Sequence, residues 1–267
     1  MEELKKKARE LLESGAVKVI IGYGKGSADR PRAIFIRKPE HTDQLIYNEQ
    51  CLQNLAVYLT KPEVKGLGKP AIVARVPTLR AILQLSSENQ IKEGDVLVLG
   101  ISLEGRLLEI PDFKAIETYL AGCNLDLTAE EKASIEKLEK MSADERWKFW
   151  QDQFAKCIKC YACRASCPMC YCERCLVECN QPQWVPVPSH QIGNLDWHII
   201  RAMHLAGRCV GCGNCERACP VGIPLMLLNN KLAEEVFKNF GSRAGLKAGQ
   251  EYALGVFKPD DKENFIK

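Results

Sequence analysis

Eight cysteines in two matching motifs are the residues of this chain whose types and spacing most clearly indicate chemistry. Each motif reads Cys-x2-Cys-x2-Cys-x3-Cys-Pro, and the cysteines are Cys157, Cys160, Cys163 and Cys167, then Cys209, Cys212, Cys215 and Cys219. Three thiolates at this spacing lie on one tight loop and can face three corners of an iron–sulfur cubane, while the fourth begins a segment that points elsewhere. Zinc sites usually take their cysteines as two separated pairs. The spacing therefore predicts iron–sulfur clusters rather than zinc.

The two motifs resemble those of the bacterial two-cluster ferredoxin family. In that family the fourth cysteine of each motif ligates the cluster of the other motif. The resemblance implies two [4Fe-4S] clusters: Cys157, Cys160, Cys163 and Cys219 for the first, and Cys209, Cys212, Cys215 and Cys167 for the second. Pro168 and Pro220, which follow the fourth cysteines, fix the direction in which the chain leaves each loop.

The residues around the first motif, CIKCYACRASCPMCYCERCLVE, are similar to the iron–sulfur region of the beta subunits of coenzyme F420-reducing hydrogenases and formate dehydrogenases, including homologues associated with heterodisulfide reductase. In those subunits an α/β domain precedes the ferredoxin part. The resemblance implies a subunit of an anaerobic complex that relays electrons from or to a hydrogenase-type or formate dehydrogenase-type catalytic subunit. Its other partner would be a flavoprotein or a heterodisulfide-reductase-type protein.

Two other functions compete with the relay. In the first, the chain is a flavin-containing oxidoreductase subunit with the flavin in residues 1–122. The flavin-binding members of the family carry a Gly-rich segment followed by a helix, whereas here Gly22-x-Gly24-x-Gly26 leads to Ser27 and Pro31. Without a helix N-terminus no dipole holds a phosphate, so an ordinary turn is favoured over a flavin site. In the second, the clusters are structural and the chain is a scaffold.

The remaining cysteines and the histidines carry weaker signals. Between the motifs lies a group whose spacing matches no common zinc ligand set: Cys170, Cys172, Cys175 and Cys179. Three interpretations compete for it: a third iron–sulfur cluster, a zinc site, or thiols without metal. Cys51 and Cys123 stand alone and are expected to be small buried hydrophobic residues. His198 and His204 face opposite sides of a predicted helix. No arrangement of serine, histidine and carboxylate groups indicates a catalytic site in this chain, so we expect a non-catalytic electron-transfer subunit.

Alternating apolar runs and amphipathic stretches predict an α/β domain over residues 1–122. The expected strands are 17–22, 33–37, 70–74 and 95–101, and the expected helices are 48–59 and 78–88. A helical connector follows over 123–156, where Ser142 or Asp144 can cap the second helix. Residues 157–240 form an α+β bacterial ferredoxin-like two-cluster domain with an insertion at 168–208, and 241–267 form a C-terminal tail. Helices are also expected at 194–206 and 223–240.

Composition agrees with metal ligation inside a reducing compartment. The chain has 267 residues, 46% hydrophobic residues and 14 cysteines, twelve of them between Cys157 and Cys219. This crowding favours metal binding over disulfides and predicts the cytoplasm. A net charge of +3 gives no reason to expect nucleic acid. The sequence has no apolar run of membrane-spanning length, and the charged stretch at residues 1–13 does not resemble a signal peptide.

Overall fold

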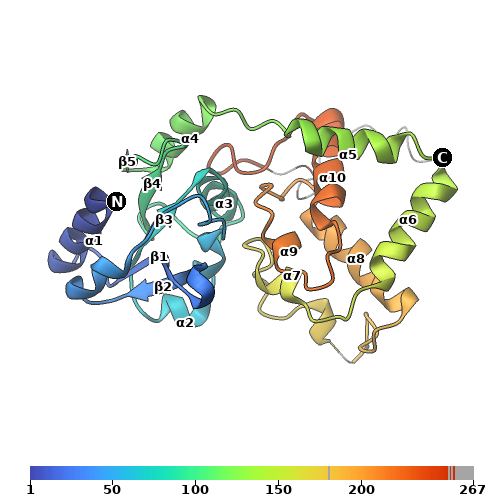
Figure 1. Cartoon of the computed structure of the whole chain (residues 1–267), viewed down its shortest axis with the longest axis horizontal. Helices are drawn as coiled ribbons and strands as arrows, with labels where there is room; N and C mark the ends of the chain where they lie inside the picture. The colour runs from blue at the N-terminus through green and yellow to red at the C-terminus, as the bar shows by residue number, and fades with distance from the viewer. Residues whose placement is uncertain (180, 252, 254, 256–267) are drawn as a thin grey trace.

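A five-stranded mixed sheet organises the N-terminal half of the protein. The computed structural model describes residues 1–179, 181–251, 253 and 255 (Figure 1). The strands are β1 (Val19–Lys25), β2 (Pro31–Ile36), β3 (Pro70–Ala74), β4 (Leu97–Ile101) and β5 (Leu107–Ile110). The sheet order is β2-β1-β3-β4-β5; β1, β3 and β4 run parallel, and the two edge strands pair antiparallel to their neighbours.

The four expected strands are present, β3 with the expected ends and the other three with ends shifted by up to three residues, whereas β5 was not predicted. Every residue of β1 from Val19 to Gly24 is buried, as a strand covered on both faces should be. The expected turn at Gly22 and Gly24 is wrong, because both residues lie inside β1. A side chain at Gly22 would overlap Leu45, and one at Gly24 would overlap Ile34. These glycines allow close packing and do not open a helix.

Helices and short turns cover the sheet. They are α1 (Glu2–Glu13), η1 (Ser27–Asp29), η2 (Pro39–Gln44), η3 (Leu55–Tyr58), α2 (Pro62–Lys65), α3 (Val76–Ser87) and α4 (Phe113–Ala121). The expected helix at 48–59 is wrong, since only η3 forms there. Asn48 and Asn54 each accept a hydrogen bond from the backbone N–H two residues ahead. Such side-chain bonds compete with helical ones and hold this segment in turns.

The second half contains helices and loops around the cysteine motifs. They are α5 (Ala129–Glu139), α6 (Ala143–Ala155), α7 (Ala162–Ala165), η4 (Leu176–Glu178), α8 (Gln191–Leu205), α9 (Asn214–Arg217) and α10 (Leu225–Phe240). Ser142 caps α6 through a reciprocal pair of bonds with Glu145, which confirms one of the two expected caps. The named strands of the described residues all belong to the N-terminal sheet, so this half departs from the expected α+β character.

Helix α3 lies between the sheet and the cysteine-rich half (Figure 1). Arg80 on α3 donates to the carbonyls of Val210 and Ala244, at 2.9 Å each. The backbone of Gly245 donates to Gln84 at 2.9 Å. The first residues of the expected tail therefore pack against α3, while 256–267 lie outside the described residues. The limits of the domains stay a prediction.

Asn214 joins the two halves of the molecule. Its side chain accepts the backbone N–H of Asn54 at 3.0 Å and donates to the Ser166 carbonyl at 2.9 Å, and the residue is only 4% exposed. Asn214→Ala leaves these buried groups without partners, so we expect urea unfolding to show a loss of about 2 kcal/mol. Asn239→Ala is the matched control, because Asn239 is exposed and should change stability by less than about 0.5 kcal/mol. Equal losses in the two variants would contradict the bridging role.

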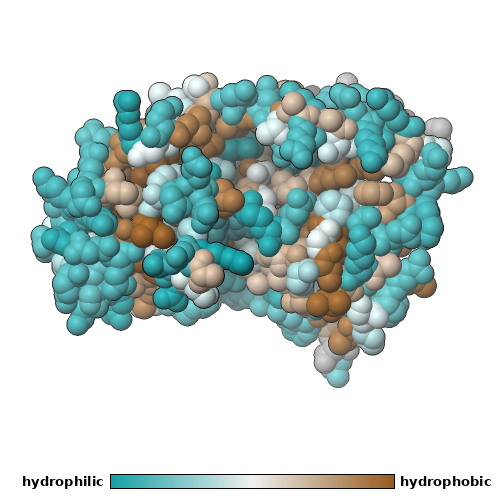
Figure 2. All heavy atoms as spheres, viewed as in Figure 1, coloured by the Kyte–Doolittle hydropathy of each residue, from teal (hydrophilic) through white to brown (hydrophobic). Residues whose placement is uncertain are grey.

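The face drawn in Figure 2 is mainly hydrophilic, with apolar patches on both halves. Some large apolar side chains of the cysteine-rich half are well exposed, among them Ile158 at 58% and Trp184 at 62%. None of the described helices combines the length and the apolar character that crossing a lipid bilayer requires.

Candidate metal centre

The two cysteine motifs fold into the same backbone turn. The residue two positions after the first cysteine has a positive φ in both copies, 52° at Lys159 and 68° at Gly211. The residue after the second cysteine does too, with 55° at Tyr161 and 72° at Gly213. Glycine adopts this conformation freely, whereas Lys159 and Tyr161 adopt it at a cost. The first copy is therefore held in the turn by its surroundings, and the turn itself is shared.

The turn directs backbone N–H groups at the cysteine sulfurs. Lys159 donates its N–H to Cys157 Sγ at 3.3 Å, and in the second copy Gly211 N–H makes the corresponding bond to Cys209. Asn214 N–H does the same for Cys212. Each bond lowers the pKa of the thiol it reaches. Donors of this kind also stabilise a more negative, reduced metal centre.

Residues from both motifs meet around one small cavity. Its wall contains the three x2-spaced cysteines of the second motif together with the fourth cysteine of the first: Cys209, Cys212, Cys215 and Cys167. This is the group that the ferredoxin resemblance assigned to a single cluster. The short helices α7 and α9, each carrying the third cysteine of its motif, lie in contact with one another and bring the two loops together.

The other four cysteines are also close in space. Cys157 is close enough to Cys160 and Cys219 for their charges to raise the pKa of its thiol. Cys157 affects the pKa of Cys163 in the same way. Cys157 and Cys163 are each 8% exposed, whereas Cys160 is exposed. This group, which contains the first three cysteines of the first motif and is called the first group below, therefore has one edge that reaches solvent; the group around the cavity is called the second group.

Burial sets the protonation of these thiols. It raises the pKa of Cys209 to about 12, and that of Cys212 and Cys163 to about 11. Thiols with such values stay protonated near neutral pH unless a cation compensates the thiolate. Metal binding supplies that charge and releases the protons. A set of four thiols around one cavity, with backbone N–H donors on the sulfurs, fits an iron–sulfur cluster by its donor chemistry.

The four cysteines of the insertion do not form one group. Cys170 lies beside Cys167 and donates a hydrogen bond to its sulfur, which lowers the pKa of Cys167 and raises that of Cys170. Cys172 is exposed, and Cys179 donates to the Cys175 carbonyl at 3.6 Å. Across the described residues, no three His, Cys, Asp or Glu side chains are grouped as for a single metal ion. The three interpretations of these cysteines stay predictions.

The segment before α8 packs on the first cysteine loop. Ser189 donates to the Cys157 carbonyl at 2.5 Å, Lys159 Nζ donates to the Pro186 carbonyl, and Val185 is 1% exposed. This proline-containing segment therefore covers the first cysteine loop, although its Trp184 is itself exposed. Of the isolated cysteines, Cys51 is buried as expected and Cys123 is half-buried.

One buried residue of α8, Arg201, was missed as a member of the site, and the burial of His198 on the same helix was not expected. Arg201 is 4% exposed and lines the cavity with the four cysteines. His198 is 2% exposed and stacks on Phe154 with ring centroids 4.5 Å apart. The sequence did contain a signal, since His198 and Arg201 share the helix face of the buried residues Asn194, Trp197 and Leu205. Polar residues on a buried face require a partner or a function.

His198 makes the stability of this half depend on pH. Burial, reinforced by nearby Arg201, lowers the pKa of His198 from its usual 6.5 to about 4. Between these values the unfolded chain binds a proton that the folded chain does not, so stability is present above about pH 6.5 and is lost as pH falls. We expect the low pKa of His198 to reduce the free energy of unfolding by about 2 kcal/mol between pH 7.5 and pH 5, as measured by urea unfolding.

His198→Phe keeps the stacked ring and should remove that part of the pH dependence. His41→Phe is the matched control, because His41 is exposed and its replacement should leave the wild-type pH profile unchanged. If the loss of stability between pH 7.5 and pH 5 is the same in His198→Phe as in wild type, His198 is not its source.

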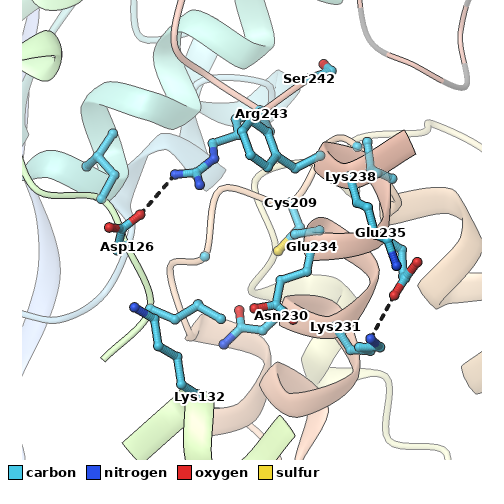
Figure 3. Close-up of a pocket in the computed structure, with 18 of the residues that line it drawn as sticks. Asp126, Lys132, Cys209, Asn230, Lys231, Glu234, Glu235, Lys238, Ser242 and Arg243 are labelled. Atoms are coloured by element: carbon cyan, nitrogen blue, oxygen red, sulfur yellow. Dashed lines mark hydrogen bonds and ion pairs between the residues drawn. The ribbon is translucent and has the colours of Figure 1, made fainter. Parts of the chain in front are cut away.

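A pocket of about 500 Å³ opens beside the second motif. Figure 3 shows Cys209 at its wall, among charged side chains of α10 and of neighbouring segments, which carry Asp126, Lys132 and Arg243. Lys231 pairs with Glu235 at 2.7 Å and Arg243 pairs with Asp126 at 3.3 Å. Gly211, the positive-φ residue of the second turn, also lines the pocket. The pocket thus reaches the second motif at Cys209 and Gly211, and Cys160 of the first motif is not part of its lining.

Comparison with known proteins agrees with this chemistry. Residues 205–224 match the 4Fe-4S binding domain family. The chain is 33% identical over 110 residues to the F420-dependent formate dehydrogenase subunit beta of Methanocaldococcus jannaschii, a match that covers 40% of this chain and 27% of that protein. The F420-dependent formate dehydrogenase 1 subunit beta of Methanococcus maripaludis is 37% identical over 106 residues, again 40% of this chain and 27% of the relative.

A third relative is more distant. The acetyl-CoA decarbonylase/synthase complex subunit alpha 1 of Methanosarcina mazei is 22% identical over 211 residues, which is 78% of this chain and 22% of that protein. The chain thus spans about a quarter of the length of each of these curated relatives. The matches give no support to a flavin in this chain, and two of the three glycines considered for one, Gly22 and Gly24, lie inside a strand. The expected resemblance to iron–sulfur beta subunits is confirmed over two fifths of the chain, with a matched domain that binds a [4Fe-4S] cluster.

Proposed function

We propose that this chain is an electron-relay subunit that carries two [4Fe-4S] clusters. Its partners in the complex would be a catalytic subunit of the hydrogenase or formate dehydrogenase type and a flavoprotein or heterodisulfide-reductase-type protein. When bound, each cluster accepts and returns one electron without forming or breaking a substrate bond. The observation that supports the proposal is the cavity lined by cysteines of both motifs, Cys167, Cys209, Cys212 and Cys215.

The ligand sets follow the exchange seen in two-cluster ferredoxins. Cys209, Cys212, Cys215 and Cys167 would hold one cluster, and their common cavity supports this set. Cys157, Cys160, Cys163 and Cys219 would hold the other, supported by the proximity of Cys157 to Cys160 and Cys219. Because each motif gives one ligand to the other site, the two clusters would lie close enough for one electron to pass between them.

Different surroundings of the two groups support a relay rather than a scaffold. The first group has an exposed edge at Cys160, next to the exposed side chain of Ile158. The second group is covered by α3 and adjoins the pocket of Figure 3 through Cys209. One partner can therefore exchange an electron at each end. The chain's own residues bind the clusters, exclude water and donate N–H groups to the sulfurs.

Anaerobic reconstitution followed by iron and sulfide analysis tests this proposal. We expect about eight iron and eight sulfide per chain, and two reducible centres in an EPR-monitored redox titration. Iron near four per chain would overturn the two-cluster assignment. Two clusters that accept no electron at accessible potentials would overturn the relay in favour of a scaffold. Flavin released by heat from the purified chain would instead favour the flavin-containing oxidoreductase.

A further inference from the structure

Helix α8 places one arginine between the two cysteine groups. Arg201 lines the cavity of the second group, and its guanidinium donates to the carbonyl of Cys163, a cysteine of the first group, at 3.4 Å. The residue is 4% exposed. The same side chain is therefore next to both proposed clusters.

Arg201 has no carboxylate partner among the described residues. Two other arginines near the cysteines do: Arg208 pairs with Glu88, and Arg164 pairs with Glu178. The Nε group of Arg201 also has no hydrogen-bond partner in the described part of the chain. A buried guanidinium without a counter-charge is strongly unfavourable. Some anion that belongs to this site must balance it.

The groups near Arg201 that can carry negative charge are cysteine sulfurs of both groups. Burial alone lowers the pKa of Arg201, but Cys215, Cys167, Cys163 and Cys170 together raise it above its usual value. Cys215 and Cys167 belong to the second proposed ligand set, and Cys163 belongs to the first. Four thiolates make each cluster site negative as a whole, and an added electron makes it more so.

We propose that Arg201 is the shared counter-charge of the two clusters and raises both reduction potentials. This inference rests on the proposed function, since it requires both clusters to be present. A buried cation is weakly screened, so it stabilises the reduced form of each neighbouring centre more than the oxidised form. Because one guanidinium serves both sites, removal of its charge should lower both potentials, whereas a counter-charge of one site alone would shift only one.

The test is an EPR-monitored redox titration of anaerobically reconstituted full-length chain with Arg201 replaced. Arg201→Gln and Arg201→Met remove the charge, and Arg201→Lys keeps it. At a fixed ambient potential, we expect the reduced-to-oxidised ratio of both centres to fall at least tenfold in the neutral variants, which is about 59 mV for a one-electron couple. Arg201→Lys should shift both far less. Lys148→Gln is the control for net charge, because Lys148 is 68% exposed and should shift neither potential.

The outcomes separate this inference from the proposed function. If wild type holds two reducible clusters but the neutral variants keep both potentials, or lower only one, the shared counter-charge is wrong and the relay stands. If wild type itself lacks two clusters, the proposed function fails. Should the neutral variants bind no iron, retention of both clusters by Arg201→Lys would support the charge-balancing role, and loss in all three variants would overturn it.

Discussion

Replacing Cys167 by serine is expected to remove the cluster of the second motif and leave that of the first. Cys167 belongs to the first motif by sequence, but it lines the cavity of Cys209, Cys212 and Cys215. Serine is a poor ligand for iron in such a site, so iron should fall from about eight to about four per chain. The remaining EPR spectrum should match that of Cys212→Ser and differ from that of Cys160→Ser. By the same reasoning, Cys219→Ser should match Cys160→Ser.

Cys170→Ser is the matched control for Cys167. Its sulfur donates a hydrogen bond to Cys167, so it is the nearest cysteine that is outside the eight proposed ligands. We expect this variant to keep about eight iron and both spectra. If Cys167→Ser keeps both centres, or gives the spectrum of Cys160→Ser, the exchange of ligands between the motifs is wrong. Loss of a cluster in Cys170→Ser would place Cys170 in the ligand set.

The shared turn of the two motifs could be expected from sequence because the spacing of the cysteines determines it, whereas the exchange of the fourth cysteine came from the resemblance to two-cluster ferredoxins. Four residues at equivalent positions have a positive φ, and this conformation directs N–H groups to sulfur whichever residue supplies it. Spacing gives no information on which helix face packs over the cysteines. The sequence expectation therefore contained the eight cysteines but omitted Arg201, whose position depends on the packing of α8.

The sheet shows the same division between local and long-range information. Strand β3 was predicted with its observed ends, Pro70–Ala74, because a β-branched run between Pro and Arg leaves few alternatives. Strand β5, Leu107–Ile110, is short and lies at an edge, and its pairing with β4 gives it a strand conformation. Residues 48–59 have helical spacing, but asparagine side chains take the hydrogen bonds of the backbone there. Periodicity does not detect that competition.

Glu88 and Arg208 form a buried charged contact between the two halves of the protein. The carboxylate of Glu88, at the end of α3, accepts from two guanidinium nitrogens of Arg208, with 2.8 Å for Nε. Tyr171 donates to the same carboxylate at 2.6 Å. The side chain of Glu88 is only 2% exposed, and that of Arg208 is 16% exposed. Arg208 directly precedes Cys209, so this pair fixes the start of the second cysteine loop against α3.

We expect a double-mutant cycle in urea unfolding to give a coupling energy of about 2 kcal/mol or more for this pair. Glu88→Gln and Arg208→Met should each cost about 3–5 kcal/mol, because each leaves a buried charge without its partner. The double variant should cost less than the sum, since neither charge remains. Iron should also be lost to a chelator faster from the single variants than from wild type, because the second loop is no longer held.

Lys148 and Asp152 provide the matched control cycle. They form an ion pair of 2.7 Å on α6, but their side chains are 68% and 57% exposed. Solvent screens such a pair, so its coupling should be only about 0.3–0.5 kcal/mol. If the Glu88–Arg208 coupling is as small as this, burial does not strengthen the contact. The attachment of the second cysteine loop would then depend on the uncharged contacts of Asn214 with Asn54 and Ser166 and on the hydrogen bonds of Arg80 to backbone carbonyls.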